Sequence, residues 1–464
     1  MAETLNTDYL IAGSGAVGMA FADVLLDETD ADIILVDRHH KPGGHWNDAY
    51  SFVTLHQPSA FYGVSSCELS KGRIDETGLN AGLQELASGA EVSAYFDEVM
   101  RHKFLPTGRV RYFPMCDYIG NHQFRSLLTG EVFDVNVERK FVDATHLKTS
   151  VPSTHSPGFS VADGVRFMPL NELPKMGEPP AGYVIVGGGK TAIDAVLWLL
   201  EQRVDPDTIR WIMPRDAWLI NRRMTQTGED FFEDAIGGQA AQMEAIAAAS
   251  DLEDLFDRLE AANFMFRIDT SVRPKMFHGA TISENELREL RRVKNIIRMG
   301  RVSAINANEI ILAEGTIPTG PDQLHVDCSA SAIPNLEIKP VFDGDTITPQ
   351  TVRSYQPVFS AAFIAHVEAA YATEEEKKAL CNVVPLPNHV TDWPKMTAAF
   401  MMNQYTWSQD KPLRQWLLNN RLDGFSKTVA NISPDDAKKQ AILKRLRGNM
   451  MPAMANLQKL MAAG

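Results

Sequence analysis

The residues Gly13–Gly18, which read G-S-G-A-V-G, have the types and spacing of a turn that binds a diphosphate. Gly13 permits a tight turn out of a strand, Gly15 has no Cβ and lets a pyrophosphate approach the backbone, and Gly18 lets the next helix pack closely. A helix beginning at Ala16 would add unpaired N–H groups and the positive end of its dipole. The motif therefore predicts dinucleotide binding.

An acid stands where such a motif needs one. Asp37 ends the apolar run Ile33–Val36, and a carboxylate at the end of this strand can accept both hydroxyls of a ribose. We count the neighbouring Arg38 with the same predicted site.

The same pattern returns at Gly187–Ala192, which reads G-G-G-K-T-A, with alanine as a tolerated variant of the third key glycine. It is not a P-loop, because that motif would need a glycine where Val184 stands. No acid ends the next strand. Arg215 lies close to that place, which favours the 2′-phosphate of NADPH, although Asp216 follows it directly. The predicted contacts are Gly187, Gly189, Lys190, Thr191 and Arg215, with NADH as the alternative to NADPH.

A loop after the first motif carries a family resemblance. It reads Gly43-Gly44-His45-Trp46, and a glycine pair allows close backbone approach to a ligand. Together with the first glycine motif and its acid, this string resembles the FAD domain of flavin-containing monooxygenases and Baeyer–Villiger monooxygenases. More loosely, it is similar to other flavoproteins with two dinucleotide domains, such as glutathione reductase. The resemblance implies FAD in the first fold, with Asp37 on its ribose and Gly44, His45 and Trp46 near the flavin.

Two later segments extend the resemblance, which covers most of residues 5–215 and 300–370. Val326–Ala330 is similar to the point where such proteins return to the FAD domain, and Asp327 matches the acid supplied there. Gln356 precedes a helix whose start, aimed at the flavin, would favour negative charge on the reduced ring.

The chain departs from these families at two places. The string FxGxxxHxxx(W/D) is missing before the second glycine motif, since residues 164–173 contain no histidine. The asparagine that follows GG-x-W in flavin-containing monooxygenases is replaced by His56 or Gln57. We predict that His56 donates or accepts a proton near neutral pH and that Gln57 donates a hydrogen bond.

These motifs predict an FAD-dependent, NAD(P)H-using oxidoreductase. By resemblance it would be a monooxygenase that uses O2 through a peroxyflavin to oxidise a small organic substrate. An NAD(P)H-dependent reductase or dehydrogenase without oxygenation is the alternative, which the missing histidine string favours. A second alternative is a non-catalytic dinucleotide-binding protein that interacts with a partner.

Composition excludes several other classes. The four cysteines are scattered without a CxxC pair, so neither a metal site nor a redox-active dithiol is predicted. A net charge of -14 disfavours nucleic acid and anionic lipid as partners. No signal peptide and no run of about 18 apolar residues is visible, so we expect a cytoplasmic protein without a membrane span.

The elements that must position these residues repeat along the chain. A buried strand, a glycine turn, a helix and a second strand occur from Tyr9 and again from Tyr183. We therefore predict an α/β protein with two Rossmann-like dinucleotide-binding domains. The predicted parts are an FAD domain at 1–165 and 322–395, an NAD(P)H domain at 166–321 with a helical insertion at about 221–297, and a helical segment at 396–464. The insertion would serve as a lid or a dimer surface, which leaves a homo-oligomer open.

Overall fold

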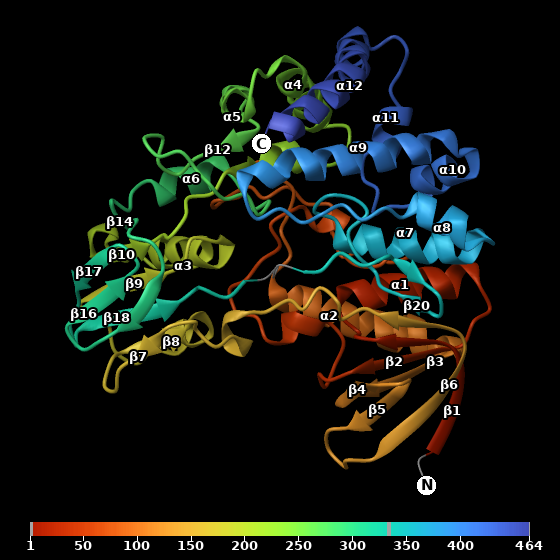
Figure 1. Cartoon of the computed structure of the whole chain (residues 1–464), viewed down its shortest axis with the longest axis horizontal. Coiled ribbons are helices and arrows are strands. Elements are labelled where there is room, and N and C mark those ends of the chain that lie inside the picture. The colour runs from red at the N-terminus through yellow and green to blue at the C-terminus, as the bar shows by residue number, and fades with distance from the viewer. Residues whose placement is uncertain (1–2, 332–335, 464) are drawn as a thin grey trace.

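Two sheets built around parallel strands, two smaller sheets and a layer of helices make up the described protein, as the computed structural model in Figure 1 shows. The structure describes residues 3–331 and 336–463. The first two residues of the predicted 1–165 segment, residues 332–335 of the 322–395 segment and residue 464 lie outside it. Among the described helices, none combines the length and the apolar character needed to cross a membrane.

The first sheet contains the first glycine motif. Its strand order is β19-β20-β6-β1-β2-β3, with β20, β6, β1, β2 and β3 parallel. The chain runs outward from β1 to β2 and β3 and then returns to the other side of β1 as β6, so the strand order reverses between β1 and β6. The strands are β1 (Glu3–Ala12), β2 (Ile33–Asp37), β3 (Val110–Pro114), β4 (Cys116–Gly120), β5 (Gln123–Ser126), β6 (Val132–Asp143), β19 (Phe342–Asp343) and β20 (Thr346–Ile347).

Helices cover one face of this sheet and a hairpin covers the other. On the helical face, α1 (Ala16–Glu28), α2 (Gly89–Val99) and α7 (Pro357–Ala370) contribute to one apolar core, and α7 lies alongside α1. On the opposite face, β4 and β5 contribute Cys116 and Phe124, which pack against Leu10 and Ile34. Because residues 9–12 of β1 and 33–36 of β2 are buried on both faces, these two segments are continuous apolar runs.

The second sheet repeats this plan around the second glycine motif. Its order is β14-β10-β9-β18-β8, all strands are parallel, and the order reverses between β9 and β18. Helices α3 (Lys190–Glu201) and α6 (Glu284–Leu290) cover one face, and a β-meander covers the other. The sheet strands are β8 (Phe167–Pro169), β9 (Gly182–Val186), β10 (Ile209–Ile212), β14 (Asn295–Ile297) and β18 (Gln323–Asp327). The meander strands are β15 (Val302–Ile305), β16 (Glu309–Leu312) and β17 (Gly315–Pro318), and β7 (Ser160–Val161) pairs with β15 in parallel.

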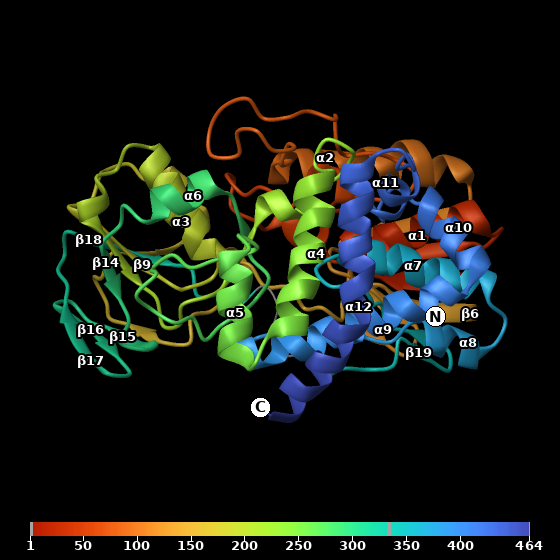
Figure 2. The same cartoon turned by 90° about the horizontal axis from the view of Figure 1, so that it is seen from above.

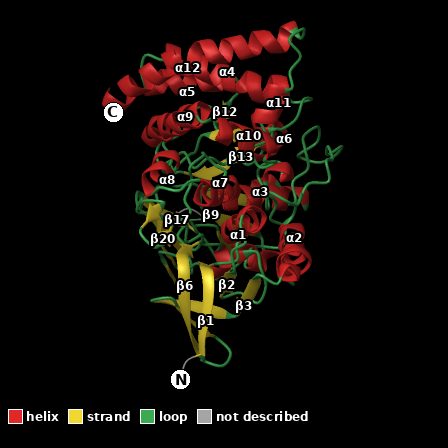
Figure 3. Cartoon of the chain, turned by 90° about the vertical axis from the view of Figure 1, so that its right-hand side faces the viewer, coloured by secondary structure: helices red, strands yellow, loops and turns green. Residues whose placement is uncertain are grey.

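The insertion and the C-terminal segment form one helical layer, at the end of the molecule away from the N-terminus (Figure 3). Figure 2 shows α4 beside α12. A shared core joins Trp218 and Phe256 to Trp393 and Leu457, so neither part buries its apolar face alone. The helices of this layer are α4 (Phe232–Ala248), α5 (Leu252–Ala261), α9 (Trp393–Gln409), α10 (Lys411–Asn419), α11 (Ser426–Ala430) and α12 (Ala437–Ala463). α8 (Glu374–Leu380) follows α7 and contributes Leu380 to the core of the first sheet. The small sheet β12-β11-β13 links this layer to the second sheet: β11 (Leu219–Asn221), β12 (Met265–Phe266) and β13 (Thr281–Ile282).

Three predicted boundaries need correction. β7 pairs with β15, so the second domain begins by Ser160 and not at residue 166. β18 pairs with β9, so the second domain extends through Asp327 and does not end at residue 321. β14 is likewise a strand of the second sheet, so the insertion predicted at 221–297 ends before Asn295. These errors have one cause: a strand of two to five residues joins its sheet through partners far away in the chain, which local pattern does not reveal.

Candidate dinucleotide sites

The first glycine turn connects β1 to α1 at the place where the strand order reverses. Gly13 has φ +100°, a conformation that favours glycine. A Cβ on Gly18 would lie 1.9 Å from the carbonyl oxygen of Gly13, so only glycine lets α1 pack this closely on the turn. A Cβ on Gly13 would lie 3.1 Å from Cγ2 of Thr145, which follows β6. The turn is thus built at the crevice where open α/β sheets bind ligands.

The loop Gly43–Asn47 covers this turn. The Gly43 N–H donates to the Ser14 carbonyl at 3.0 Å, and a Cβ on Gly44 would lie 2.9 Å from Cα of Gly15. Two glycine backbones therefore meet, and a side chain at either position would narrow the space for a diphosphate. Trp46 anchors the loop, because its Nε1–H donates to the Tyr62 hydroxyl at 2.7 Å.

Asp37 lies at the end of β2, where the sequence places it, and accepts four hydrogen bonds. Ser14 donates through its backbone N–H at 2.6 Å and its hydroxyl at 2.9 Å, and His39 donates through its backbone N–H and through Nδ1, both at 2.8 Å. The His39 ring also contacts Asp48 at 2.8 Å. Burial acts to raise the pKa of Asp37, but these hydrogen bonds outweigh it and lower the pKa. Hydrogen bonds to Asp37 and Asp48 raise the pKa of His39 to about 9. Arg38 is exposed.

The helices at both glycine turns lack caps of their own. The N-cap residue is Gly15 in α1 and Gly189 in α3, and neither helix has a side-chain cap or an acid in its first turn. Five other helices are capped by a serine, threonine or aspartate: α2, α5, α6, α8 and α10. The free N–H groups and the positive dipole end at α1 and α3 are what a phosphate needs. α7, which Gln356 precedes, also starts without a side-chain cap or an acid, as do α9 and α11.

The second glycine turn is packed on one side and open on the other. A Cβ on Gly187 would lie 2.4 Å from the Cys328 carbonyl oxygen, and one on Gly188 would lie 2.9 Å from the Arg215 carbonyl oxygen. No heavy atom of the described residues lies within 4 Å of a Cβ built on Gly189. This turn therefore leaves room for a ligand at Gly189.

Arg215 and Asp216, which follow β10, have different partners, and the sequence does not reveal this. Asp216 pairs with the Arg298 guanidinium through both oxygens, at 2.8 and 3.0 Å. Arg215 instead donates to the neutral side chain of Asn388 at 2.9 Å. Burial and the nearby Arg301 lower the pKa of Arg215, which reflects a cation without a compensating carboxylate. The Asp216 carboxylate is thus already paired with a cation, whereas the Arg215 guanidinium contacts a neutral amide and is available to bind an anion.

A repeated turn follows the central return strand of each sheet. Asp143 accepts from the Thr145 backbone at 3.1 Å and its hydroxyl at 2.6 Å, and Asp327 accepts from Ser329 in the same way at 2.9 and 2.6 Å. Asp327 therefore lies beside the second glycine turn and does not supply the acid near the first. Its counterpart at the first turn is Asp143, which our sequence analysis missed. The strings V-D-A-T at 142–145 and V-D-C-S at 326–329 are a signal that could have revealed it.

His56 and Gln57 lie in the segment between β2 and α2. The His56 carbonyl accepts from Nε of Arg222 at 2.9 Å and from the Thr281 hydroxyl at 2.6 Å. Burial, and then the charges of Lys190 and Arg222, lower the pKa of His56 well below its ordinary value. The imidazole is therefore neutral at neutral pH. Burial likewise lowers the pKa of His45 to about 4.

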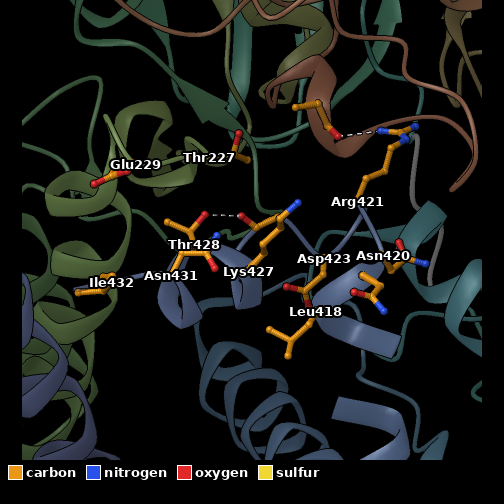
Figure 4. Close-up of a pocket in the computed structure, with 14 residues that line it drawn as sticks. Thr227, Glu229, Leu418, Asn420, Arg421, Asp423, Lys427, Thr428, Asn431 and Ile432 are labelled. Carbon is orange, nitrogen blue, oxygen red and sulfur yellow. Dashed lines mark hydrogen bonds between the residues drawn. The ribbon is translucent and has the colours of Figure 1, made fainter. Parts of the chain in front are cut away.

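A hollow of about 330 Å³ lies away from both turns (Figure 4). It lies where the loop at Ala60, the start of the insertion at 227–229 and residues 418–432 converge. Arg421 lies on its wall, but its guanidinium already donates to the carbonyls of Ala60, Tyr62 and Val64. None of the lining residues belongs to a glycine turn, so we assign this hollow no role in dinucleotide binding.

Two mycobacterial proteins match the whole chain. The uncharacterized proteins Mb2023 of Mycobacterium bovis and Rv2000 of Mycobacterium tuberculosis are each 46% identical over 462 residues, which is 100% of this chain and 86% of theirs. The chain belongs to the family of these proteins. No family model matches the chain.

Solved structures of flavoproteins also align with the chain. A flavin-containing monooxygenase from Stenotrophomonas maltophilia is 13% identical and aligns over 82% of this chain and 100% of its own, with a TM-score of 0.42. An oxidized steroid monooxygenase bound to NADP is 12% identical over 78% of this chain and 85% of its own, with a TM-score of 0.46. A bacillithiol disulfide reductase from Bacillus cereus is 12% identical over 79% and 100%, with a TM-score of 0.44. Because these identities and TM-scores are low, the fold assignment rests on the strand orders and glycine turns described above.

Proposed function

We propose that this protein is an FAD-dependent oxidoreductase that uses NADPH and acts as a monooxygenase on a small organic substrate. One observation carries the proposal: each of the two sheets has, where its strand order reverses, a helix whose N-cap residue is a glycine and which has no side-chain cap. Ligands of open α/β sheets bind at such reversals, and uncapped helix starts favour phosphate. Two such places in one chain suit two dinucleotides.

We assign FAD to the first turn. The loop Gly43–Asn47 lies over Gly15, which suits a cofactor that stays bound through many turnovers. The contact of Gly44 with Gly15 leaves only backbone at the place where a diphosphate would lie. Asp37 could bind a ribose by exchanging its bonds to Ser14 or His39 for bonds to the sugar hydroxyls.

We assign NADPH to the second turn, which is open at Gly189 as a site for an exchanging ligand should be. Lys190 and Thr191 begin the helix there and are proposed contacts for the diphosphate. Arg215 is proposed to bind the 2′-phosphate, because Asp216, which would repel that group, is paired with Arg298.

When bound, FAD would accept a hydride from the nicotinamide and supply the chemistry that uses O2. The chain's own part is to bind and orient the two cofactors and to keep water away. Because the His56 imidazole is neutral at neutral pH, we propose that it acts as a hydrogen-bonding group and not as an imidazolium acid. Gln57, the next residue, is proposed as a second donor.

Reduction under anaerobic conditions tests this function. The purified protein, loaded with FAD, should lose its yellow colour on addition of NADPH, and more slowly with NADH. Oxygen uptake is then measured with panels of amines, ketones and aromatics, and a compound that raises NADPH oxidation and appears as an oxygenated product supports the monooxygenase. NADPH oxidation with electron transfer to an acceptor but no oxygenated product would favour a reductase. FAD that NADPH never reduces would contradict both.

A further inference from the structure

Three side chains connect the two glycine turns. Lys190, the first residue of α3, forms an ion pair with Asp194 one turn along the helix. The Tyr50 hydroxyl donates to the other carboxylate oxygen of Asp194 at 2.6 Å, although the two residues are 144 positions apart. The Lys190 and Asp194 side chains are 11% and 13% exposed, and Tyr50 is buried. Asp194 is thus shared between a cation at the second turn and a phenol from the first domain.

Tyr50 belongs to the segment that covers the first turn. It lies three residues after the loop Gly43–Asn47, whose backbone contacts Ser14 and Gly15. Phe52 strengthens the contact with α3, because its ring stacks on Trp198 with centroids 4.8 Å apart and planes at 17°. A change at the start of α3 can therefore reach the covering loop through a short chain of direct contacts.

Lys190 lies where an arriving anion would compete for it. The space beside Gly189 is open, Lys190 is the next residue, and α3 presents uncapped N–H groups. A diphosphate there attracts the ammonium away from Asp194, since phosphate and carboxylate compete for the same donor. Asp194 would then keep Tyr50 as its hydrogen-bond donor.

We propose that Asp194 competes with the bound dinucleotide for Lys190 and that Tyr50 transmits the outcome to the first site. This inference rests on the proposed function. With Lys190 drawn to the diphosphate, the Asp194 carboxylate loses its cation and holds the Tyr50 hydroxyl more strongly, because hydrogen bonds to an uncompensated charge are stronger. The covering loop is then held more firmly over the first turn. NADP⁺ binding therefore tightens FAD binding, and by linkage FAD tightens NADP⁺ binding.

FAD release tests the coupling. In the wild-type protein, saturating NADP⁺ should slow FAD dissociation about five-fold or more. Tyr50→Phe keeps the ring but loses the hydroxyl, so NADP⁺ should no longer slow FAD release. Tyr371→Phe is the matched control, because its hydroxyl also donates to an aspartate, Asp410, at 2.8 Å, but at the C-terminal end of α7. Full slowing in Tyr50→Phe would overturn the proposal.

Two variants with opposite expected signs test the competition. Asp194→Asn keeps an acceptor for Tyr50 but frees Lys190, so calorimetry should show tighter NADP⁺ binding than in the wild type. Lys190→Met should weaken NADP⁺ binding about ten-fold. Asp254→Asn is the control, because it breaks a similar pair with Arg258 one turn along α5 and should leave NADP⁺ binding unchanged. Weaker NADP⁺ binding by Asp194→Asn contradicts the competition.

The failure of this inference differs from the failure of the proposed function. A wild-type protein that binds neither FAD nor NADP⁺ refutes both. A wild-type protein that binds both, with NADP⁺ affinity unaltered by Asp194→Asn and FAD release unaltered by NADP⁺, refutes the coupling alone.

Discussion

The two glycine turns share one design and differ in what packs on them. At the first turn, the backbone of Gly44 contacts Gly15, and the Asp37 carboxylate accepts hydrogen bonds from Ser14 and His39. At the second turn, the space at Gly189 is open and the end of β10 carries no such acid. The same strand–turn–helix unit thus suits a retained cofactor in one place and an exchanging one in the other.

The difference arises from segments outside the unit. Each turn is built from a few glycines. The loop that covers the first turn, and the Arg298 side chain that pairs with Asp216 near the second, come from residues further along the chain. Near the second turn, the charge of Asp216 is paired with Arg298, a residue that follows β14. How tightly a cofactor is retained, and which cofactor is preferred, can therefore differ between two sites that share the same glycine turn.

The largest expected difference between the two turns is in the cost of adding one methyl group. Gly18→Ala places a Cβ against the Gly13 carbonyl and should destabilise the protein by about 3 kcal/mol or more. Gly189→Ala meets no neighbour and should cost about 1 kcal/mol or less, the usual range for an alanine at a helix N-cap. Urea unfolding of both variants measures this. Equal losses would mean that the two turns are packed alike.

Next in size is the effect of Arg215 on the choice of nicotinamide cofactor. Arg215→Ala should lower kcat/KM for NADPH by about ten- to a hundred-fold, the loss expected for a charged hydrogen bond, and leave NADH little changed. Flavin reduction rates with both cofactors check this. Arg223→Ala is the control, because its guanidinium pairs with Asp234. An equal loss of kcat/KM for NADPH and NADH would show that Arg215 does not bind the 2′-phosphate.

The smallest expected effect is on stability at alkaline pH and belongs to the first turn. The pKa of His39 is raised to about 9 in the folded protein, from an ordinary value of 6.5. Its imidazolium therefore contributes stability that is complete below pH 6.5 and is lost as the pH rises through about 9. His39→Gln should remove this part of the decline in the melting temperature between pH 6.5 and 9. A variant that declines as steeply as the wild type would show that the His39 bridge adds no stability.

Much of the fold could be predicted because it depends on local pattern. Apolar runs bounded by glycine identify β1 and β9, and Asp37 lies at the end of β2 as expected. What could not be predicted depends on distant contacts. The pairing of β18 with β9 moves Asp327 to the second site, and the bond between Tyr50 and Asp194 joins residues with no common motif.

The helical parts show the same limit. The spacing predicts helices in both the insertion and the C-terminal segment, but not that α4 and α12 pack together over one core. Amphipathic spacing identifies a face that must be buried and does not identify its partner. In the same way, His56 stands out in the sequence, whereas the lowering of its pKa depends on its burial and on Lys190 and Arg222 from other segments.

Counting the dinucleotides bound by each chain tests the central claim most directly. Equilibrium dialysis with FAD and NADP⁺ should give one of each per wild-type chain. Replacing Gly189 with tryptophan, whose side chain would fill the open space at the second turn, should leave one FAD and remove NADP⁺. A wild-type chain that binds no FAD, or a Gly189→Trp variant that binds NADP⁺ as the wild type does, would contradict the account of two separate glycine-turn sites.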